Sequence, residues 1–110
     1  MIDVVGLVDL EGDTGNDSLV ANGAGVDSKI QMGSLLMQGW DGDDIIVANG
    51  TTVLGKATLW GGIGNDTFTL VDNVVGGNLY LDGWIGTDSL HDTGNMITGS
   101  KTVQRIETII

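Results

Sequence analysis

Four aspartates stand at regular intervals in this 110-residue sequence, and a glycine-rich stretch precedes each of them. They are Asp17, Asp44, Asp66 and Asp88, which follow one another in steps of 27, 22 and 22 along the chain. A carboxylate and the backbone carbonyls of a glycine turn are hard oxygen donors, which is the ligand type that Ca²⁺ takes. The residue types and their spacing therefore indicate a series of cation sites, provided that the fold brings the four turns together.

Each aspartate ends a short glycine-rich turn, and the four turns share one register. Their sequences are GDTGND from residue 12, GWDGDD from residue 39, GGIGND from residue 61 and GWIGTD from residue 83. Glycines at positions 6, 33, 55, 77 and 99 keep the same steps, which adds a fifth, partial unit. A repeat of about 22 residues is typical of solenoids, in which each unit stacks on its neighbours.

Apolar residues flank every turn at alternate positions, which predicts short strands with one buried face. The matching positions are Leu19, Ile46, Phe68 and Leu90 after the turns, and Leu10, Met37, Leu59 and Leu81 with Val8, Leu35, Ala57 and Leu79 before them. A further short strand is predicted from Val4, Val53, Val75 and Ile97. The opposite corner of each coil reads ANG at 21–23 and 48–50, VDN at 71–73 and TGN at 93–95, residues that tolerate a left-handed backbone.

We therefore predict an all-β fold, a parallel β-solenoid of the β-roll or β-helix kind, with about five coils. The repeat has about 22 residues, except for one coil of about 27 residues, whose extra length is expected within 22–31. Nineteen glycines and no proline agree with many turns and few helices, since glycine costs about 1 kcal/mol in a helix interior. Residues 1–110 are expected to form one module, a fragment of a larger protein, with 101–110 as a cap-like end.

Stacking would place the four aspartates about 5 Å apart, because adjacent coils are separated by the strand spacing. Two carboxylates at that distance repel each other by about 0.8 kcal/mol in bulk water and by more near a protein surface. A cation between successive turns removes this repulsion, and Ca²⁺ suits it better than Mg²⁺, which demands a stricter octahedron. Four turns leave three gaps and hence up to three calcium sites. In the alternative interpretation the aspartates point to solvent and the turns only reverse the chain.

The turns resemble the hemolysin-type calcium-binding repeat of the RTX (repeat-in-toxin) family, written G-G-x-G-x-D-x-U-x with U a large apolar residue. GGIGNDTFT matches every specified position, and the resemblance spans residues 12–91. The second glycine of the motif is replaced by Asp13, Trp40 and Trp84. The family places its turns on two sides of a coil of about 18 residues, whereas the single turn in each longer repeat places them on one side here.

The resemblance implies that Ca²⁺ is bound between turns through aspartates and backbone carbonyls, and that the protein is secreted or exposed at the cell surface. It implies no catalysis. The ligands expected from it are Gly12, Thr14, Gly15, Asp17, Gly39, Asp41, Gly42, Asp44, Gly61, Ile63, Gly64, Asp66, Gly83, Ile85, Gly86 and Asp88. Asp66 is expected to be shared between the coils on either side.

The remaining features restrict the partners. A net charge of −11 repels nucleic acid and anionic lipid, and no apolar run is long enough for a membrane span. His91 is the single histidine, and no serine or glutamate recurs with it to build a triad or a zinc site, so we expect a surface position.

Two other functions stay open. One is an accessory glycan-binding module of a secreted enzyme, and the other is an adhesin spacer or assembly unit that associates with itself through exposed solenoid ends. Trp40, Trp60 and Trp84 would be the sugar platform, but Gly62 is expected to break their row, which favours indoles that pack as lids on the turns.

Overall fold

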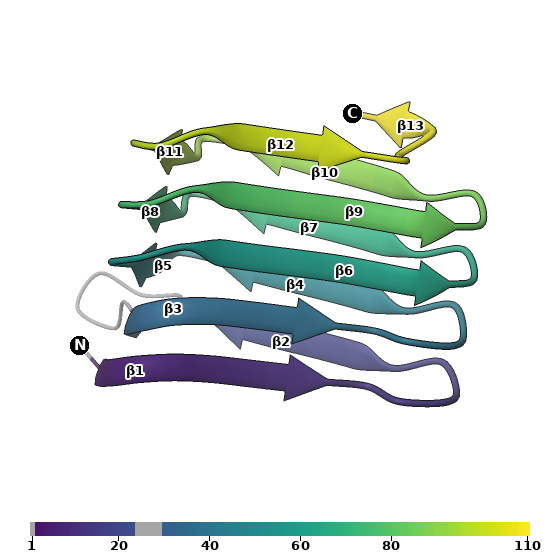
Figure 1. The fold of residues 1–110 in the computed structure, drawn as a ribbon, viewed down its shortest axis with the longest axis horizontal. Helices are drawn as coiled ribbons and strands as arrows, with labels where there is room; N and C mark the ends of the chain where they lie inside the picture. Colours follow the sequence, from purple (N-terminus) through teal and green to yellow (C-terminus); the bar gives the residue numbers. More distant parts are fainter. Residues whose placement is uncertain (1, 24–29) are drawn as a thin grey trace.

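The computed structural model describes residues 2–23 and 30–110, which contain thirteen strands and no helix. Successive coils stack in parallel to form a β-solenoid with a spacing of about 22 residues, as predicted (Figure 1). One sheet comprises β1 (Ile2–Glu11), β3 (Ile30–Gln38), β5 (Thr51–Val53), β6 (Ala57–Ile63), β8 (Val74–Val75), β9 (Leu79–Ile85), β11 (Met96–Ile97) and β12 (Lys101–Gln104). The other comprises β2 (Ser18–Asn22), β4 (Ile45–Asn49), β7 (Thr67–Val71), β10 (Ser89–Thr93) and β13 (Thr108–Ile109).

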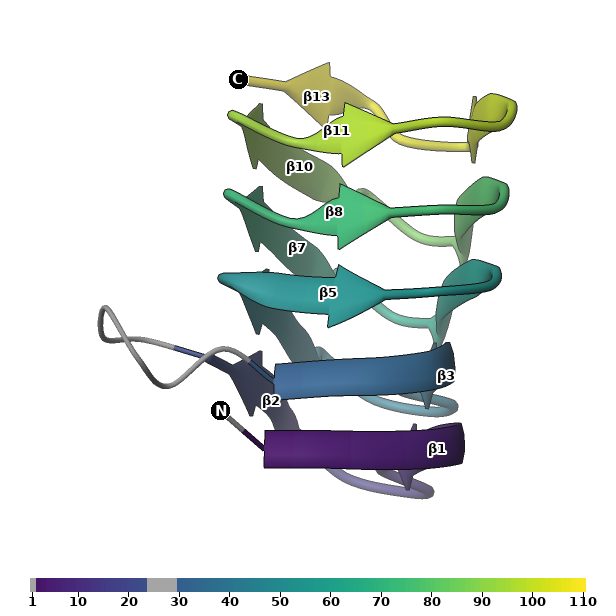
Figure 2. The same ribbon diagram turned by 90° about the vertical axis from the view of Figure 1, so that its left-hand side faces the viewer.

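The larger sheet bends, so that each later coil contributes two strands to it. β3 is long enough to pair with both β5 and β6, whereas the following coils divide into β5 and β6, β8 and β9, and β11 and β12. Figure 2 shows β5, β8 and β11 stacked on one side of the molecule. The coil therefore has three flanks around a single core.

The pairing register stacks equivalent residues in columns. Phe68 pairs with Ile46 in the preceding coil and with Leu90 in the following coil, each at the distance of one repeat along the chain. Phe68 and Ile46 are completely buried, and the columns of Met37, Leu59 and Leu81 lie in the same core. The apolar alternation read from the sequence is thus confirmed at these positions, while the side chain of Val4 lies outside the described part.

The long first coil differs from the others on the side away from the glycine turns. Asn22 pairs with Asn49. These partners are separated along the chain by the same long step as Asp17 and Asp44, which are 27 residues apart. Ile30, in contrast, pairs with Thr51 at close to the ordinary step. The added length is thus confined between Asn22 and Ile30. Residues 24–29, where most of the predicted insertion falls, lie outside the described residues.

The corners opposite the glycine turns contain an asparagine ladder. Gly50, Asp72 and Gly94 have φ of 66°, 55° and 71°, so the left-handed corners are confirmed there. Next to them, buried Asn73 accepts hydrogen bonds from the Thr51 amide (3.0 Å) and hydroxyl (2.6 Å) and donates to the Ala48 carbonyl (2.8 Å). The buried side-chain amide of Asn73 therefore links its own coil to both sides of the corner in the preceding coil.

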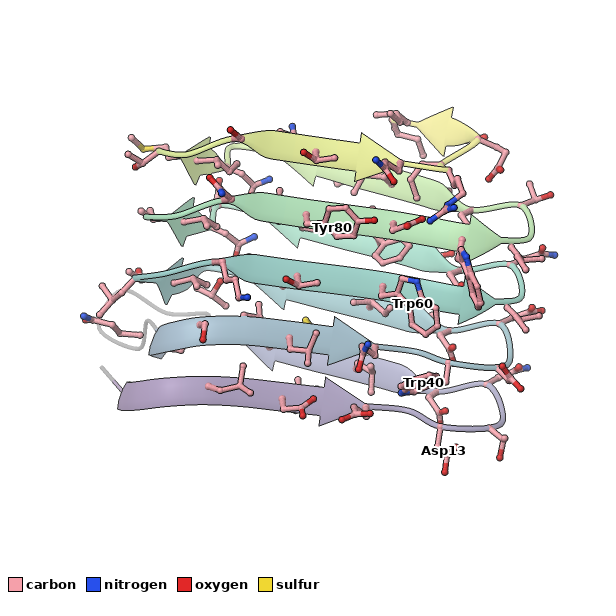
Figure 3. The ribbon with its side chains drawn as sticks, in the orientation of Figure 1. Asp13, Trp40, Trp60 and Tyr80 are labelled. Atoms are coloured by element: carbon pink, nitrogen blue, oxygen red, sulfur yellow. The ribbon has the colours of Figure 1, made fainter. Side chains whose placement is uncertain are left out.

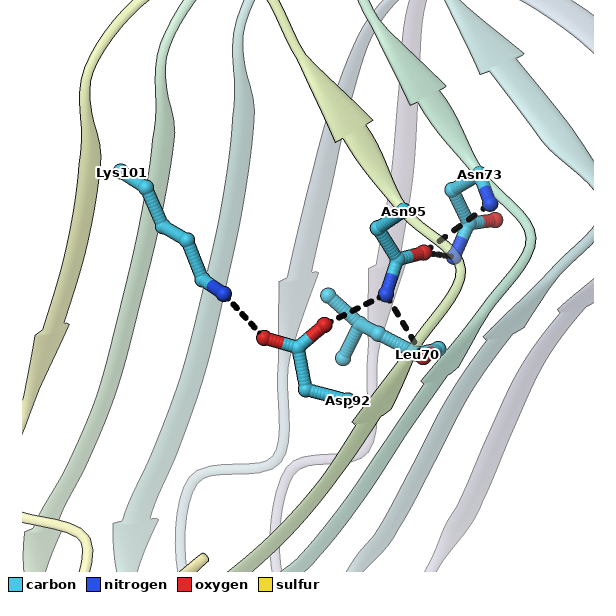
Figure 4. A network of polar contacts seen from close by, with 5 residues as sticks. All are labelled: Leu70, Asn73, Asp92, Asn95 and Lys101. Carbon is cyan, nitrogen blue, oxygen red and sulfur yellow. Dashed lines mark hydrogen bonds and ion pairs between the residues drawn. The ribbon is translucent and has the colours of Figure 1, made fainter.

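Asn95 continues the ladder in the next coil. It accepts from the Asn73 amide at 2.9 Å and donates to the Leu70 carbonyl at 2.8 Å and to Asp92 at 2.6 Å (Figure 4). Asp92 also forms an ion pair with Lys101. These contacts fix the corners and leave the glycine turns on the opposite edge of the stack.

Residues 101–110, expected to form a cap-like end, extend both sheets. Lys101 to Gln104 pair with Leu79 to Asp82, and Thr108 and Ile109 pair with Ser89 and Leu90. The segment thus forms a further coil on top of the 83–88 turn.

Candidate metal site

The four glycine-rich turns lie one above another along a single edge of the solenoid, where β1, β3, β6 and β9 pass into β2, β4, β7 and β10 (Figure 1). The second residue of each turn has positive φ: 71° at Asp13, 71° at Trp40, 98° at Gly62 and 72° at Trp84. The fourth residue does too, with φ between 100° and 138° at Gly15, Gly42, Gly64 and Gly86. The departures from glycine at the second position therefore leave the backbone conformation unchanged.

The turn aspartates point into the solenoid. Asp44 and Asp66 are each 1% exposed and Asp88 is 0% exposed, while Asp17 in the first turn is half-buried. The alternative in which the aspartates point to solvent is wrong for the three buried ones. Burying an ionised carboxylate is costly unless other groups compensate its charge. The hydrogen-bond partners of each carboxylate oxygen therefore determine how much of this cost the protein itself offsets.

One oxygen of each carboxylate holds the preceding coil. Oδ1 of Asp44 accepts a hydrogen bond from the backbone amide of Asp17 at 2.8 Å, and Oδ1 of Asp66 accepts one from Asp44 at 2.9 Å. Oδ1 of Asp88 accepts one from Asp66 at 2.7 Å. This ladder, which was not predicted, links each turn to the turn below it and offsets part of the cost of burial.

The other oxygen has no protein partner. In the described part of the chain, the buried side-chain oxygen and nitrogen atoms without a hydrogen bond are Oδ2 of Asp17, Asp44, Asp66 and Asp88. A buried acceptor left unpaired costs about 1–3 kcal/mol, and more when it is charged. The repetition of the same orphaned atom in all four turns marks it as a feature of the repeat.

Each orphaned Oδ2 faces the first glycine of its own turn. A Cβ atom built on Gly39 or Gly61 would collide with Oδ2 of Asp44 or Asp66, and at Gly12 the distance to Oδ2 of Asp17 would be 2.6 Å. The Cβ position on Gly39 is also 2.8 Å from the carbonyl oxygen of Gly61 in the next coil, and the Cβ position on Gly61 is 3.0 Å from the carbonyl oxygen of Gly83. A carboxylate oxygen and a carbonyl oxygen thus converge beside the glycine α-carbon, in a cradle where a side chain would collide with them.

Burial in the column raises the pKa of three of its carboxyls, those of Asp44, Asp66 and Asp88. The pKa of Asp66 rises from 3.8 to about 7, mainly because burial disfavours the charged form and further because Asp88 and Asp44 are close. Burial also raises the pKa of Asp44 and Asp88, and neighbouring carboxylates add to the rise. Without a counter-charge these three carboxyls therefore resist ionisation.

The other predicted ligands contribute backbone groups. The third turn residues Thr14, Asp41 and Ile63 form a line of parallel bridges. The carbonyls of Ile63 and Ile85 accept hydrogen bonds from the amides of Gly42 (2.8 Å) and Gly64 (2.9 Å). These carbonyls therefore link neighbouring turns by hydrogen bonds.

The donor set determines which metal would fit. Within residues 2–23 and 30–110, no three histidine, cysteine, aspartate or glutamate side chains come together. The cradles combine one carboxylate with backbone carbonyls, which suits a hard cation with many oxygen ligands and not Zn²⁺, which takes nitrogen and sulfur. The orphaned Oδ2 atom and the carbonyl oxygen beside it are ligands of the kind that Ca²⁺ takes.

The tryptophan row is continuous, so the expectation that Gly62 breaks it was wrong. The ring centroids of Trp40 and Trp60, which are labelled in Figure 3, are 5.0 Å apart, and those of Trp60 and Trp84 are 4.9 Å apart. Trp60 precedes Gly62 by two positions and shares its face of the strand, so its indole lies between the other two. The three indoles pack beside the turns.

His91 lies in β10, is exposed, and is 3.3 Å from the hydroxyl of Thr93, which agrees with the expected surface position.

Among the described residues no helix is long and apolar enough to cross a membrane. Comparisons with protein-family profiles, curated proteins and solved structures gave no match to this chain.

Proposed function

We propose that this protein is a non-catalytic, RTX-like calcium-binding module, in which Ca²⁺ ions bound between stacked turns stabilise the β-solenoid. The observation that carries the proposal is the column of four buried Oδ2 atoms without a partner, each opposite a glycine α-carbon. A cation in each cradle would pair the orphaned oxygen and also neutralise the charge of its carboxylate.

Water or a proton explains less of this arrangement. A water molecule would satisfy the hydrogen-bonding capacity of Oδ2 but would leave like charges one coil apart. A proton would remove the charge, but the pKa of Asp66 is about 7, so at neutral pH and above the proton would be absent in about half or more of the molecules. Ca²⁺ meets both requirements, since it accepts six to eight oxygens at about 2.3–2.6 Å, including backbone carbonyls.

The charge of the proposed ligands predicts the calcium affinity of each site and thereby the cellular compartment in which the site would be filled. Each cradle offers a single carboxylate oxygen that is free of hydrogen bonds. Calcium affinity rises with the number of charged ligands, and sites of low charge bind with Kd of about 10⁻⁴–10⁻³ M, as in extracellular modules. Such sites are filled only where calcium is abundant, which supports a secreted or cell-surface location.

Calcium titration followed by circular dichroism and thermal melting tests the proposal. Ten times the Kd of calcium should stabilise the fold by about 1.4 kcal/mol per site, whereas equal Mg²⁺ should have little effect. Asp72→Asn is a matched control, because Asp72 is exposed at the opposite corner with φ of 55°, which asparagine tolerates. Identical spectra and melting in calcium and in chelator would contradict the proposal.

The continuous tryptophan row supports a second candidate, glycan binding. Trp40 and Trp84 are 39% and 37% exposed, and Trp60 joins them in one aromatic strip. Aromatic faces bind the apolar faces of sugar rings. Electrophoresis through gels that contain soluble polysaccharides should retard the protein and not Trp60→Ala if the row binds glycan. Equal mobility in every gel would leave the indoles as packing for the turns.

A further inference from the structure

A fifth turn follows β12 although the sequence there carries neither a glycine nor an aspartate. β12 keeps the regular step, since Gln104 pairs with Asp82, and β13 then pairs with β10. Asp88 lies 22 residues after Asp66, whereas Glu107 lies only 19 residues after Asp88. The chain therefore reverses through a shorter turn than the others, and Arg105 at its start has φ of 51°.

This short turn places oxygens where the other turns place theirs. A Cβ atom built on Gly83 would collide with Oδ2 of Asp88 and also with the carbonyl oxygen of Arg105. In the preceding coil, Gly61 faces Oδ2 of Asp66 and the carbonyl of Gly83 in the same way. The Arg105 carbonyl thus takes the place of a first-glycine carbonyl, and the unpartnered Oδ2 of Asp88, a residue that is 0% exposed, lies beside the same glycine.

Glu107 takes over the other function of the aspartates. Its Oε2 accepts a hydrogen bond from the backbone amide of Asp88 at 2.7 Å, as Oδ1 of Asp88 does for Asp66 at 2.7 Å. The longer glutamate side chain reaches this amide from the shorter turn. The carboxylate ladder therefore continues into the fifth turn.

The positive charge of Arg105 is held away from the cradle. Its Nε donates to Oδ1 of Asp82 at 2.8 Å, and its Nη2 forms an ion pair with Oδ2. Asp82 is 1% exposed and also accepts from the Tyr80 hydroxyl at 2.9 Å. This pair neutralises the guanidinium and anchors the backbone whose carbonyl faces Asp88.

We propose that the gap between the 83–88 turn and the 105–107 turn is an additional calcium site, with the Asp88 carboxylate and the Arg105 carbonyl as ligands and the Glu107 carboxylate beside them. The inference rests on the proposed function. It raises the number of inter-turn sites from the three counted in the sequence to four, because the fifth turn completes a gap that the glycine motif does not mark.

Calcium stoichiometry, measured by isothermal titration and by metal analysis after equilibrium dialysis, tests the inference. The full chain should bind four ions and Asp88→Asn three, because the asparagine keeps the Oδ1 acceptor for the Asp66 amide but loses the charged oxygen. Glu107→Gln should weaken one of the four sites at least tenfold. Asp72→Asn should still bind four.

Two results would overturn the inference, and they differ in what else they overturn. If the full chain binds calcium but Asp88→Asn binds the same number of ions, this gap holds no metal and the proposed function stands. If the full chain binds no calcium, both proposals fall. Should Asp88→Asn fail to fold, unchanged affinity of every site in Glu107→Gln overturns the inference by itself.

Discussion

Replacing Asp66 by asparagine should stabilise the protein in chelator and reduce the stabilisation that calcium provides. The amide oxygen can still accept the Asp44 amide, so the ladder bond of 2.9 Å is retained. The amide nitrogen replaces the orphaned Oδ2, which removes the buried charge, and it can donate toward the Gly83 carbonyl close by. The substitution therefore separates the cost of the charge from the geometry of the turn.

The magnitude follows from the pKa of the carboxyl. Its rise from 3.8 to about 7 corresponds to about 4 kcal/mol of folding free energy that ionisation costs at neutral pH. Burying an amide instead costs about 1–3 kcal/mol where it is not fully paired, so we expect a net gain of about 2 kcal/mol. For a domain of this size that raises the Tm by roughly 10 °C.

Thermal melting at pH 7.5, in chelator and in 10 mM calcium, measures both effects, with Asp72→Asn as the control for the loss of one charge. The Asp66→Asn variant should melt higher than the parent in chelator. Its rise in Tm on adding calcium should be smaller than that of the parent. A variant that melts lower than the parent in chelator would refute the reasoning, because the carboxylate would then stabilise the metal-free fold.

Three further predictions concern the column, the core and the opposite corner. In chelator, the folded state holds the Asp66 proton more tightly than the unfolded chain, so urea-unfolding free energy should fall as pH rises from about 4 to about 7, with Asp66 contributing about 4 kcal/mol and Asp44 and Asp88 acting in the same direction; a rise over that window would contradict it. Phe68→Ala should lower the unfolding free energy by about 3–5 kcal/mol with or without calcium, since Phe68 is completely buried; a loss below about 1 kcal/mol in urea titration would argue against this core. Asn73→Ala should cost about 4 kcal/mol in the same assay and leave calcium affinity unchanged, because it removes four side-chain hydrogen bonds at the corner away from the turns; altered affinity would show that the corners are coupled.

The sequence was sufficient to predict the solenoid and the position of its turns. A fixed repeat step makes equivalent residues stack, so the apolar alternation around Phe68 predicts a shared core without any knowledge of the coil shape. The left-handed corners at Gly50 and Gly94 follow from residue type in the same way. The repeated motif indicates which residues of successive coils pair, and a single copy of the turn would not.

The hydrogen bonds of the carboxylate column could not be predicted. The sequence places Asp44 and Asp66 in adjacent coils, but which oxygen meets an amide depends on a rotamer and on the height between coils. Charge repulsion alone suggested a cation between successive carboxylates and did not distinguish the two oxygens of each. The structure divides the task, because Oδ1 binds a backbone amide and Oδ2 is left without a partner.

The fifth turn and the tryptophan row were missed for a different reason. Arg105 reaches positive φ without glycine, and Glu107 replaces aspartate in a shorter turn, so pattern matching at the regular repeat step finds nothing there. Trp60 occupies a different repeat position from Trp40 and Trp84, yet its indole fills the space above Gly62. In both places the residue stands at a different position in its repeat, and its longer side chain, that of Glu107 or Trp60, still reaches the position in space that the repeat requires.

Anomalous diffraction from crystals grown in calcium tests the central claim most directly. The account predicts anomalous peaks between successive turns, each within about 2.3–2.6 Å of an Oδ2 atom of Asp17, Asp44, Asp66 or Asp88 and of a carbonyl of the next coil. Oδ2 atoms that contact only water or protein at saturating calcium, with no anomalous peak between the turns, would contradict it.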